Sequence, residues 1–169
     1  MTDVKSGVNP LFLREDDLRQ GIELLFFGYR DFTAEPDAML AEIGLGRAHH
    51  RAIYFIGRNP GISVTDLLGI LRITKQSLSR VLGDLMDQGF VDQRQGTRDR
   101  RRRLLELTEK GVELERRLSE NQRQRMARAY RLAGAEAVEG FRRVMLGLID
   151  DADRSRFPAP AAPPRVVRR

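Results

Sequence analysis

The chain contains no cysteine. This absence excludes disulfide bonds, thiolate metal sites, cysteine nucleophiles and sensing through a reactive thiol, and it suits a reducing cytoplasm. The sequence also lacks any run near the roughly 18 apolar residues that a membrane-spanning helix needs. Its first ten residues are polar, without the apolar centre of a secretory signal. We therefore expect a soluble cytoplasmic protein.

Residue patterns that carry catalysis are also missing. Only two histidines occur among the 169 residues, and both lie in one short segment. The sequence has no glycine-rich phosphate loop, no H-E-x-x-H zinc motif and no G-x-S-x-G nucleophile motif. The paired acids Asp16-Asp17 and Asp150-Asp151 fall at predicted helix ends, where capping explains them. The sequence therefore predicts neither an enzyme nor a cofactor.

Positive charge, in contrast, is plentiful and concentrated. Lysine and arginine number 30 against 24 acids, which gives a net charge of +6 and a sequence pI near 10.4. Five arginines occupy six consecutive positions from Arg98 to Arg103, interrupted only by Asp99. This balance favours nucleic acid or another polyanion as the partner.

The segment from Thr74 to Gly89 carries the clearest local signals. Its apolar residues recur at i, i+3, i+4 and i+7, which places them on one face of a helix: Leu78, Val81, Leu82 and Leu85. Thr74 can accept hydrogen bonds from exposed backbone N–H groups at the start, and Gly89 can adopt the left-handed conformation that ends a helix. One face of this helix packs, and polar residues near its start stay free for contact.

The neighbouring segments complete a winged helix-turn-helix pattern. A turn at Asn59-Pro60-Gly61 precedes a short helix over residues 64–69, for which Ser63 and Asp66 resemble a capping box. After Gly89, residues 90–94 and 102–107 are predicted to form two strands around a turn at residues 95–101. A helix, a tight connection and a second helix, followed by an arginine-tipped hairpin, are typical of DNA-binding proteins.

Helices with broad apolar stripes flank this region. One is predicted over residues 15–32, with Pro36 ending or kinking it and residues 37–43 continuing as a short helix; another spans residues 47–57. Downstream, Thr108 can cap a helix that runs to Gly134, and a last helix is expected over residues 136–151. A winged domain of about 90 residues is too small to cover these stripes, so a second copy of the chain is the simplest partner.

The predicted recognition helix offers suitable groups for DNA. Gln76 suits adenine and Arg80 suits guanine or phosphate, while Lys75, Ser77 and Ser79 suit phosphate oxygens or single base contacts. The wing arginines Arg98, Arg100 and Arg101 can enter a minor groove, where Asp99 can hold one guanidinium in position. The alternative is that all of these are ordinary solvated side chains; the combination of helix and wing favours DNA binding.

Residues 61–111 resemble the winged helix-turn-helix of the MarR family of transcriptional regulators. The most specific likeness is Asp99-Arg100-Arg101 followed by Leu104, Leu105 and Leu107-Thr108-Glu109-Lys110-Gly111, which matches the D-x-R wing and the L-T-x-x-G start of the next helix. The resemblance covers residues 15–151. It implies a homodimer held by the first and last two helices, which reads a pseudo-palindromic DNA site and by default represses.

The resemblance also implies roles for particular residues. The wing arginine of the family falls on Arg101 and its orienting acid on Asp99, and the contacts of the recognition helix fall on Lys75, Gln76, Ser77, Ser79 and Arg80. A weaker likeness, in residues 24–37 and 46–60, is to the PetP-type branch, which is associated with photosynthetic and respiratory gene control.

Members of this family commonly sense small aromatic or phenolic ligands between the dimerisation helices and the winged domain. The candidate lining residues here are Phe26, Tyr29, Arg30, His49, His50, Ile53 and Tyr54. Aromatic residues at helical spacing are more often core residues. Adjacent histidines on a helix point about 100° apart, so they do not naturally chelate one metal ion together. A haem or metal bound by His49 or His50 alone remains an alternative. The missing cysteines exclude the thiol mechanism of some relatives.

We therefore predict a mainly α-helical fold with a small β-hairpin wing. The expected parts are a flexible arm (1–13), N-terminal dimerisation and support helices (14–57), the winged helix-turn-helix (58–108), C-terminal dimerisation helices (109–152) and a disordered basic tail rich in proline and alanine (153–169). The expected function is that of a dimeric, sequence-specific DNA-binding regulator, a repressor released by a small ligand. An architectural protein that binds DNA or RNA through charge, without reading sequence, remains the alternative.

Overall fold

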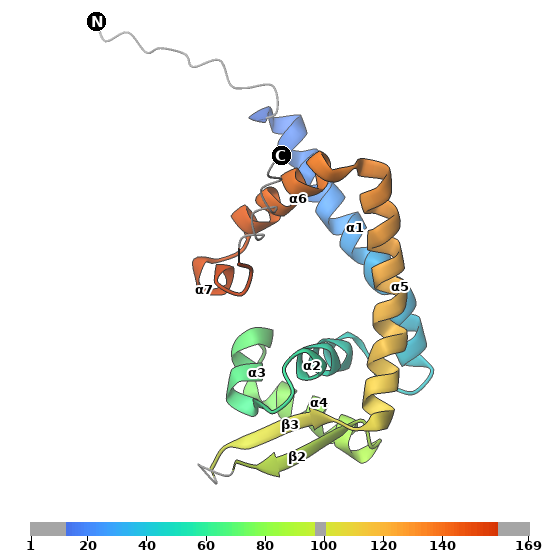
Figure 1. The fold of residues 1–169 in the computed structure, drawn as a ribbon, viewed down its shortest axis with the longest axis vertical. Helices are drawn as coiled ribbons and strands as arrows, with labels where there is room; N and C mark the ends of the chain where they lie inside the picture. The colour runs from blue at the N-terminus through green and yellow to red at the C-terminus, as the bar shows by residue number, and fades with distance from the viewer. Residues whose placement is uncertain (1–12, 97–100, 159–169) are drawn as a thin grey trace, which may run out of the picture. The chain divides into compact units, whose positions relative to one another are not determined.

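The computed structural model describes residues 13–96 and 101–158, which group into two compact units, one up to Arg125 and one from Met126. The described residues form helices and one small antiparallel sheet (Figure 1). In chain order the elements are α1 (Glu15–Ala41), α2 (Arg47–Arg58), β1 (Ile62–Ser63), α3 (Val64–Leu71), α4 (Lys75–Asp87), β2 (Val91–Gln95), β3 (Arg103–Leu107), α5 (Glu109–Ala133), α6 (Ala135–Leu148) and α7 (Asp151–Arg154). The predicted fold class, mainly helical with a hairpin wing, is confirmed. No helix in these two described stretches is long and apolar enough to cross a membrane.

The three strands form one sheet in the order β1-β3-β2. The hairpin of β2 and β3 agrees with the predicted wing to within one residue at every strand bound. Its register pairs Val91 with Leu107 and Gln95 with Arg103. Strand β1 was not predicted because two residues cannot show an alternating pattern. It forms because Ile62 pairs with Leu105 in the centre of the sheet, so the turn before α3 is attached to the wing.

The core of the first unit is built around the apolar face of α4. Leu78, Val81, Leu82 and Leu85 are all buried there, as their spacing predicts. They pack with buried residues of α1, α2, α3, β3 and α5, among them Leu40, Ile53, Ile56, Leu67, Leu105 and Leu118. His50 is buried in the same region, and this burial lowers the pKa of its imidazole, which favours the neutral form.

Helix α1 does not end at Pro36, although ending was one of the two predicted outcomes. It continues to Ala41 with the proline ring buried. A proline has no N–H to donate to the carbonyl four residues earlier, here that of Phe32. Nε2 of Gln122 in α5 donates to that carbonyl at 3.4 Å and replaces the missing donor. The replacement comes from a residue 90 positions away, so no local pattern predicts it.

The end of α4 is joined directly to the start of α5. Gly89 has φ +73°, the left-handed conformation expected of it, and its carbonyl accepts a hydrogen bond from Oγ1 of Thr108 at 2.7 Å. Oγ1 of Thr108 also accepts a hydrogen bond from the N–H of Gly111 at 3.0 Å, so the predicted cap at Thr108 is confirmed. Nζ of Lys110 donates to the carbonyl of Gln88 at 2.7 Å. These contacts satisfy carbonyl groups at the C-terminus of one helix with groups from the N-terminus of the next.

The second unit begins within α5 and contains α6 and α7. Helix α6 ends at Leu148, so the prediction of one helix through residue 151 is wrong. Ile149 has extended backbone angles, and Nε of Arg154 donates at 3.0 Å to the carbonyls of Leu146 and Ile149. These bonds terminate α6 and set the turn into α7. Of the predicted arm (1–13) and the predicted disordered tail (153–169), residues 1–12 and 159–169 lie outside the described residues. The start of the predicted tail is instead helical, since α7 extends to Arg154.

The junction between α4 and α5 predicts a large cost for Gly111→Ala. A Cβ at this position would lie 2.0 Å from the carbonyl oxygen of Phe90. That oxygen already accepts a hydrogen bond from the N–H of Thr108 at 3.1 Å. We expect the free energy of unfolding, measured by urea denaturation, to fall by about 3 kcal/mol or more.

Gly69→Ala is the matched control. Nothing lies within 4 Å of a Cβ at this position in α3, so the substitution should be neutral or stabilise by up to about 1 kcal/mol. Equal unfolding energies for Gly111→Ala and wild type would contradict the described packing of this junction.

Candidate nucleic-acid interface

Helix α4 presents its polar residues on the surface as the sequence predicts. Oγ1 of Thr74 accepts a hydrogen bond from the N–H of Ser77 at 3.1 Å and caps the helix. The five predicted contact residues are all exposed: Lys75, Gln76, Ser77, Ser79 and Arg80. Because the apolar stripe turns the other way into the core, these side chains are available to a ligand outside the protein.

A groove lies between α4, the N-terminus of α3 and the wing. We call it the α4–wing groove; it has a volume of about 490 Å³ and is lined by Ser63, Val64, Thr65, Lys75, Ser79, Leu82, Met86, Gln93, Arg101, Arg102 and Arg103. It brings together Lys75 and Ser79 of the predicted helix contacts with Arg101 of the predicted wing. Gln76, Ser77 and Arg80 do not line it. The other predicted wing residues, Arg98, Asp99 and Arg100, lie outside the described residues.

The groove includes residues that sequence reasoning missed. Gln93, Arg102 and Arg103 from the wing and Thr65 from α3 share it with the predicted contacts. Part of the signal was present, since Arg102 and Arg103 continue the run of arginines that begins at Arg100. Sequence alone did not give the strand register, in which Gln95 lies opposite Arg103 and Gln93 lies two residues earlier on the same strand.

Acidic residues hold the arginines at the base of the wing. Oδ2 of Asp66 in α3 accepts a hydrogen bond from Nη2 of Arg102 at 3.1 Å and another from Oγ of Ser63 at 2.6 Å. On the wing itself, Arg94 forms an ion pair with Glu106 across the hairpin. The sequence analysis predicted that Asp99 orients a wing guanidinium. Among the described residues, Asp66 and Glu106 make contacts of this kind. Ser63 also caps α3 by accepting from the N–H of Asp66 at 3.0 Å.

The opposite flank of α4 is attached to α2. The N–H of Gly46 donates to Nδ1 of His49 at 3.1 Å. Nδ1 must therefore be unprotonated, and the ring hydrogen is on Nε2. Nε2 lies 3.0 Å from Oδ2 of Asp84, the acceptor that this tautomer requires. One imidazole thus joins the start of α2 to the middle of the recognition helix.

The seven residues predicted to line a ligand pocket have different surroundings in the structure. Phe26, Tyr29 and Arg30 line a hollow of about 590 Å³ together with Ile22, Leu25 and Arg47, which we call the α1 hollow. His49 contacts α4, and His50 and Ile53 are buried in the core. Tyr54 is 37% exposed and packs edge-on against Phe55, with ring centroids 5.3 Å apart.

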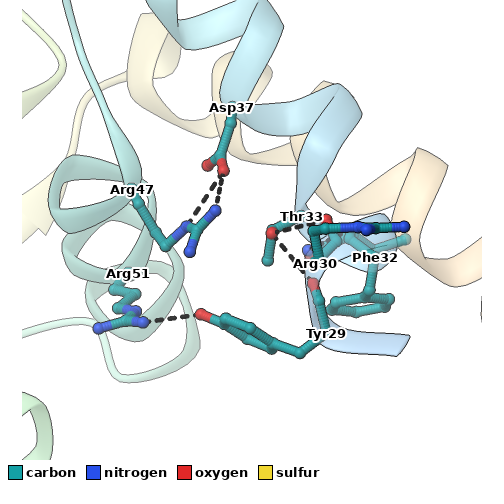
Figure 2. A network of polar contacts seen from close by, with 8 residues as sticks. Tyr29, Arg30, Phe32, Thr33, Asp37, Arg47 and Arg51 are labelled. Atoms are coloured by element: carbon teal, nitrogen blue, oxygen red, sulfur yellow. Dashed lines mark hydrogen bonds and ion pairs between the residues drawn. The ribbon is translucent and has the colours of Figure 1, made fainter. Parts of the chain in front are cut away.

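Polar contacts between α1 and α2 surround the α1 hollow. Figure 2 shows Arg47 of α2 beside Asp37 of α1, with Nε and Nη2 donating to one carboxylate oxygen at 3.0 and 2.5 Å. This pairing raises the pKa of Arg47. Nη2 of Arg51 donates to the hydroxyl of Tyr29 at 2.7 Å, and the Arg47 guanidinium lies 5.4 Å from the centroid of the same ring. The hollow therefore has apolar walls and two guanidinium groups in its lining.

A metal centre has no support in the described residues. Within residues 13–96 and 101–158 no three side chains of histidine, aspartate or glutamate gather as a metal site would require. Both ring nitrogens of His49 are engaged by Gly46 and Asp84, so His49 is not oriented to bind a metal or haem.

Comparison with known proteins agrees with this geometry. A sequence model of the MarR family matches residues 43–102. The chain is 54% identical over 156 residues to the HTH-type transcriptional regulator PetP of Rhodobacter capsulatus, covering 92% of this chain and 94% of PetP. It is 30% identical over 81 residues to the HTH-type transcriptional regulator BilQ of Clostridium symbiosum, covering 48% of this chain and 56% of BilQ.

Solved structures show the same fold. FabT of Streptococcus pneumoniae, solved in complex with DNA, superposes with a TM-score of 0.66 at 19% identity, covering 78% of this chain and 94% of FabT. A MarR protein from Peptoclostridium difficile gives a TM-score of 0.66 at 20% identity and covers 93% of this chain and 96% of that one. The match to PetP extends over nearly the whole of both chains, and the relatives are regulators rather than enzymes. The chain belongs to the MarR family of HTH-type transcriptional regulators.

Proposed function

We propose that two copies of this chain bind a pseudo-palindromic DNA operator, each with α4 in the major groove and its wing along the adjacent minor groove. The observation that carries the proposal is the α4–wing groove, in which Lys75 and Ser79 of the helix stand beside Arg101, Arg102 and Arg103 of the wing. A concave basic surface of this kind fits a phosphate backbone, while Gln76 and Arg80 on the exposed side of α4 are left to reach base edges. FabT, with the same fold, is described in complex with DNA.

The roles of Gln76 and Arg101 are separable by mutation. Gln76→Ala should change the preference at one base position by about 1–3 kcal/mol, because an amide can pair with one adenine. Arg101→Ala should weaken binding to all sequences and reduce the salt dependence by about one phosphate contact. Fluorescence anisotropy with duplexes selected from a random pool measures both effects.

Arg117→Ala is the control for charge removal, because Arg117 is an exposed arginine of α5 that does not line the α4–wing groove. It should leave both affinity and preference close to wild type. Equal loss on every duplex for Gln76→Ala would remove Gln76 from the base-reading residues.

Dimerisation is supported by the apolar residues that α1 and α6 leave exposed. In α1 the exposed fractions are 48% for Leu18, 70% for Ile22 and 63% for Phe26. In α6 they are 46% for Phe141, 64% for Val144 and 62% for Leu148. Exposed large apolar side chains in such numbers are typical of protein interfaces, and a two-fold dimer accounts for a two-fold DNA site.

Sedimentation velocity tests the dimer. Wild type should sediment as a dimer at micromolar concentration. Ile22→Asp, which places a charge in the proposed interface, should shift the protein to monomer without unfolding α4. A wild-type monomer at that concentration would contradict the proposal.

The proposed mode of control is repression that a small aromatic ligand relieves. The α1 hollow supports a ligand with an aromatic ring and a negative charge, because Phe26, Ile22 and Leu25 offer apolar contact and Arg30 and Arg47 offer guanidinium groups. Since α1 also carries the proposed dimer surface, a bound ligand can alter the spacing of the two recognition helices.

The ligand proposal can be tested with 4-hydroxybenzoate as the probe. Calorimetry should show binding, and the same concentrations should release the operator. Arg30→Met should weaken binding about tenfold by removing one charged hydrogen bond, whereas Arg19→Met, on the same helix but outside the hollow, should not. If the probe binds Arg30→Met as tightly as wild type, the α1 hollow is not its site.

A further inference from the structure

The contact between His49 and Asp84 keeps one acidic side chain of the recognition helix apart from a basic one. Arg80 and Asp84 are four residues apart on α4, so their side chains stand on adjacent turns within reach of each other. Yet none of the ion pairs among the described residues joins them. Oδ2 of Asp84 instead lies 3.0 Å from Nε2 of His49 in α2.

The imidazole is well placed to hold the carboxylate. The His49 side chain is 15% exposed, and its other nitrogen accepts the N–H of Gly46, which fixes both the ring orientation and the position of the ring hydrogen. The Asp84 side chain is 47% exposed and would otherwise sample several rotamers. A rigid donor therefore selects the orientation of a flexible acceptor.

The orientation of the Asp84 carboxylate affects the charge of the proposed DNA-binding surface. An aspartate turned toward Arg80 would pair with its guanidinium and add negative charge to the exposed side of α4 that is proposed to contact DNA. We propose that His49 is a positioning residue for DNA recognition: it holds the Asp84 carboxylate toward α2 and leaves the Arg80 guanidinium available to DNA. This inference rests on the proposed function, in which Arg80 contacts the operator.

A set of substitutions distinguishes this role from simple packing. His49→Phe keeps a ring of similar size but removes the donor to Asp84. It should weaken operator binding about two- to fivefold, the size expected for a surface pair that competes with a DNA contact. Asp84→Asn in the His49→Phe background should restore the affinity, because the amide no longer attracts Arg80. His49→Gln, which retains a donor and an acceptor, should weaken binding less than His49→Phe.

Two controls separate the effect from general electrostatics. Asp87→Asn removes an equal charge from the exposed end of the same helix, seven residues from Arg80, and should not restore the affinity of His49→Phe. In an Arg80→Ala background, His49→Phe should have no further effect on DNA binding. Thermal unfolding of each variant shows whether the fold is retained.

The tautomer can be checked in the unmodified protein. Nitrogen-15 NMR of the histidine rings should show that His49 carries its hydrogen on Nε2, with an unprotonated Nδ1 that accepts a hydrogen bond. This measurement does not depend on any variant folding. A hydrogen on Nδ1 would overturn the proposal.

The outcomes distinguish a failure of the proposed function from a failure of the proposed role of His49. If Arg80→Ala binds the operator like wild type, Arg80 is not part of the DNA interface and the proposed function fails at that residue. If Arg80→Ala weakens binding but His49→Phe does not, the positioning role of His49 alone is overturned. If His49→Phe weakens binding equally with and without Arg80, or Asp84→Asn brings no relief, His49 acts through packing and the proposal is again overturned.

Discussion

The contact on which the rest of this structure depends is the junction between the end of α4 and the start of α5. The carbonyls of Gln88 and Gly89 accept hydrogen bonds from Lys110 and Thr108, and the backbone of Phe90 passes so close to Gly111 that no side chain fits there. This arrangement gives a physical meaning to the L-T-x-x-G motif of residues 107–111: threonine bridges two chain segments and glycine permits their approach. It fixes the C-terminal end of the recognition helix at the point where the wing hairpin leaves and returns.

With its C-terminal end fixed, α4 is flanked on two sides by contacts of different character. On one side lies the α4–wing groove, where Lys75 and Ser79 meet the arginines of the hairpin and Asp66 holds Arg102. On the other side His49 of α2 contacts Asp84, and Nε2 of Gln88 donates to the carbonyl of Ile43 at 3.4 Å. The side between them is exposed and carries Gln76 and Arg80. A helix held from three directions can present such side chains in a defined orientation. Because α2 contacts the recognition helix, a shift of α2 would displace it.

Local rules were sufficient to predict much of this from sequence. The apolar spacing of α4, the caps at Ser63, Thr74 and Thr108 and the left-handed Gly89 each depend on residues within one or two turns, and the structure contains them all. The sequence was less informative where distant residues decide. Gln122 allows α1 to pass through Pro36, Leu105 creates β1, and Asp84 engages His49. The residues predicted to line a ligand pocket stay a prediction, and the structure divides most of them between the α1 hollow, the core and α4.

In the proposed complex the exposed side of α4 reads bases while the wing and the α4–wing groove hold the backbone. The most direct measurement is a competition-binding scan in which every base pair of a selected duplex is changed in turn. The account predicts losses of about 1–3 kcal/mol at a few positions in two symmetric half-sites, centred about 10 base pairs apart, with little effect elsewhere. Small and uniform losses at all positions, at the same salt concentration, would contradict it, because they would mean that charge alone binds the DNA.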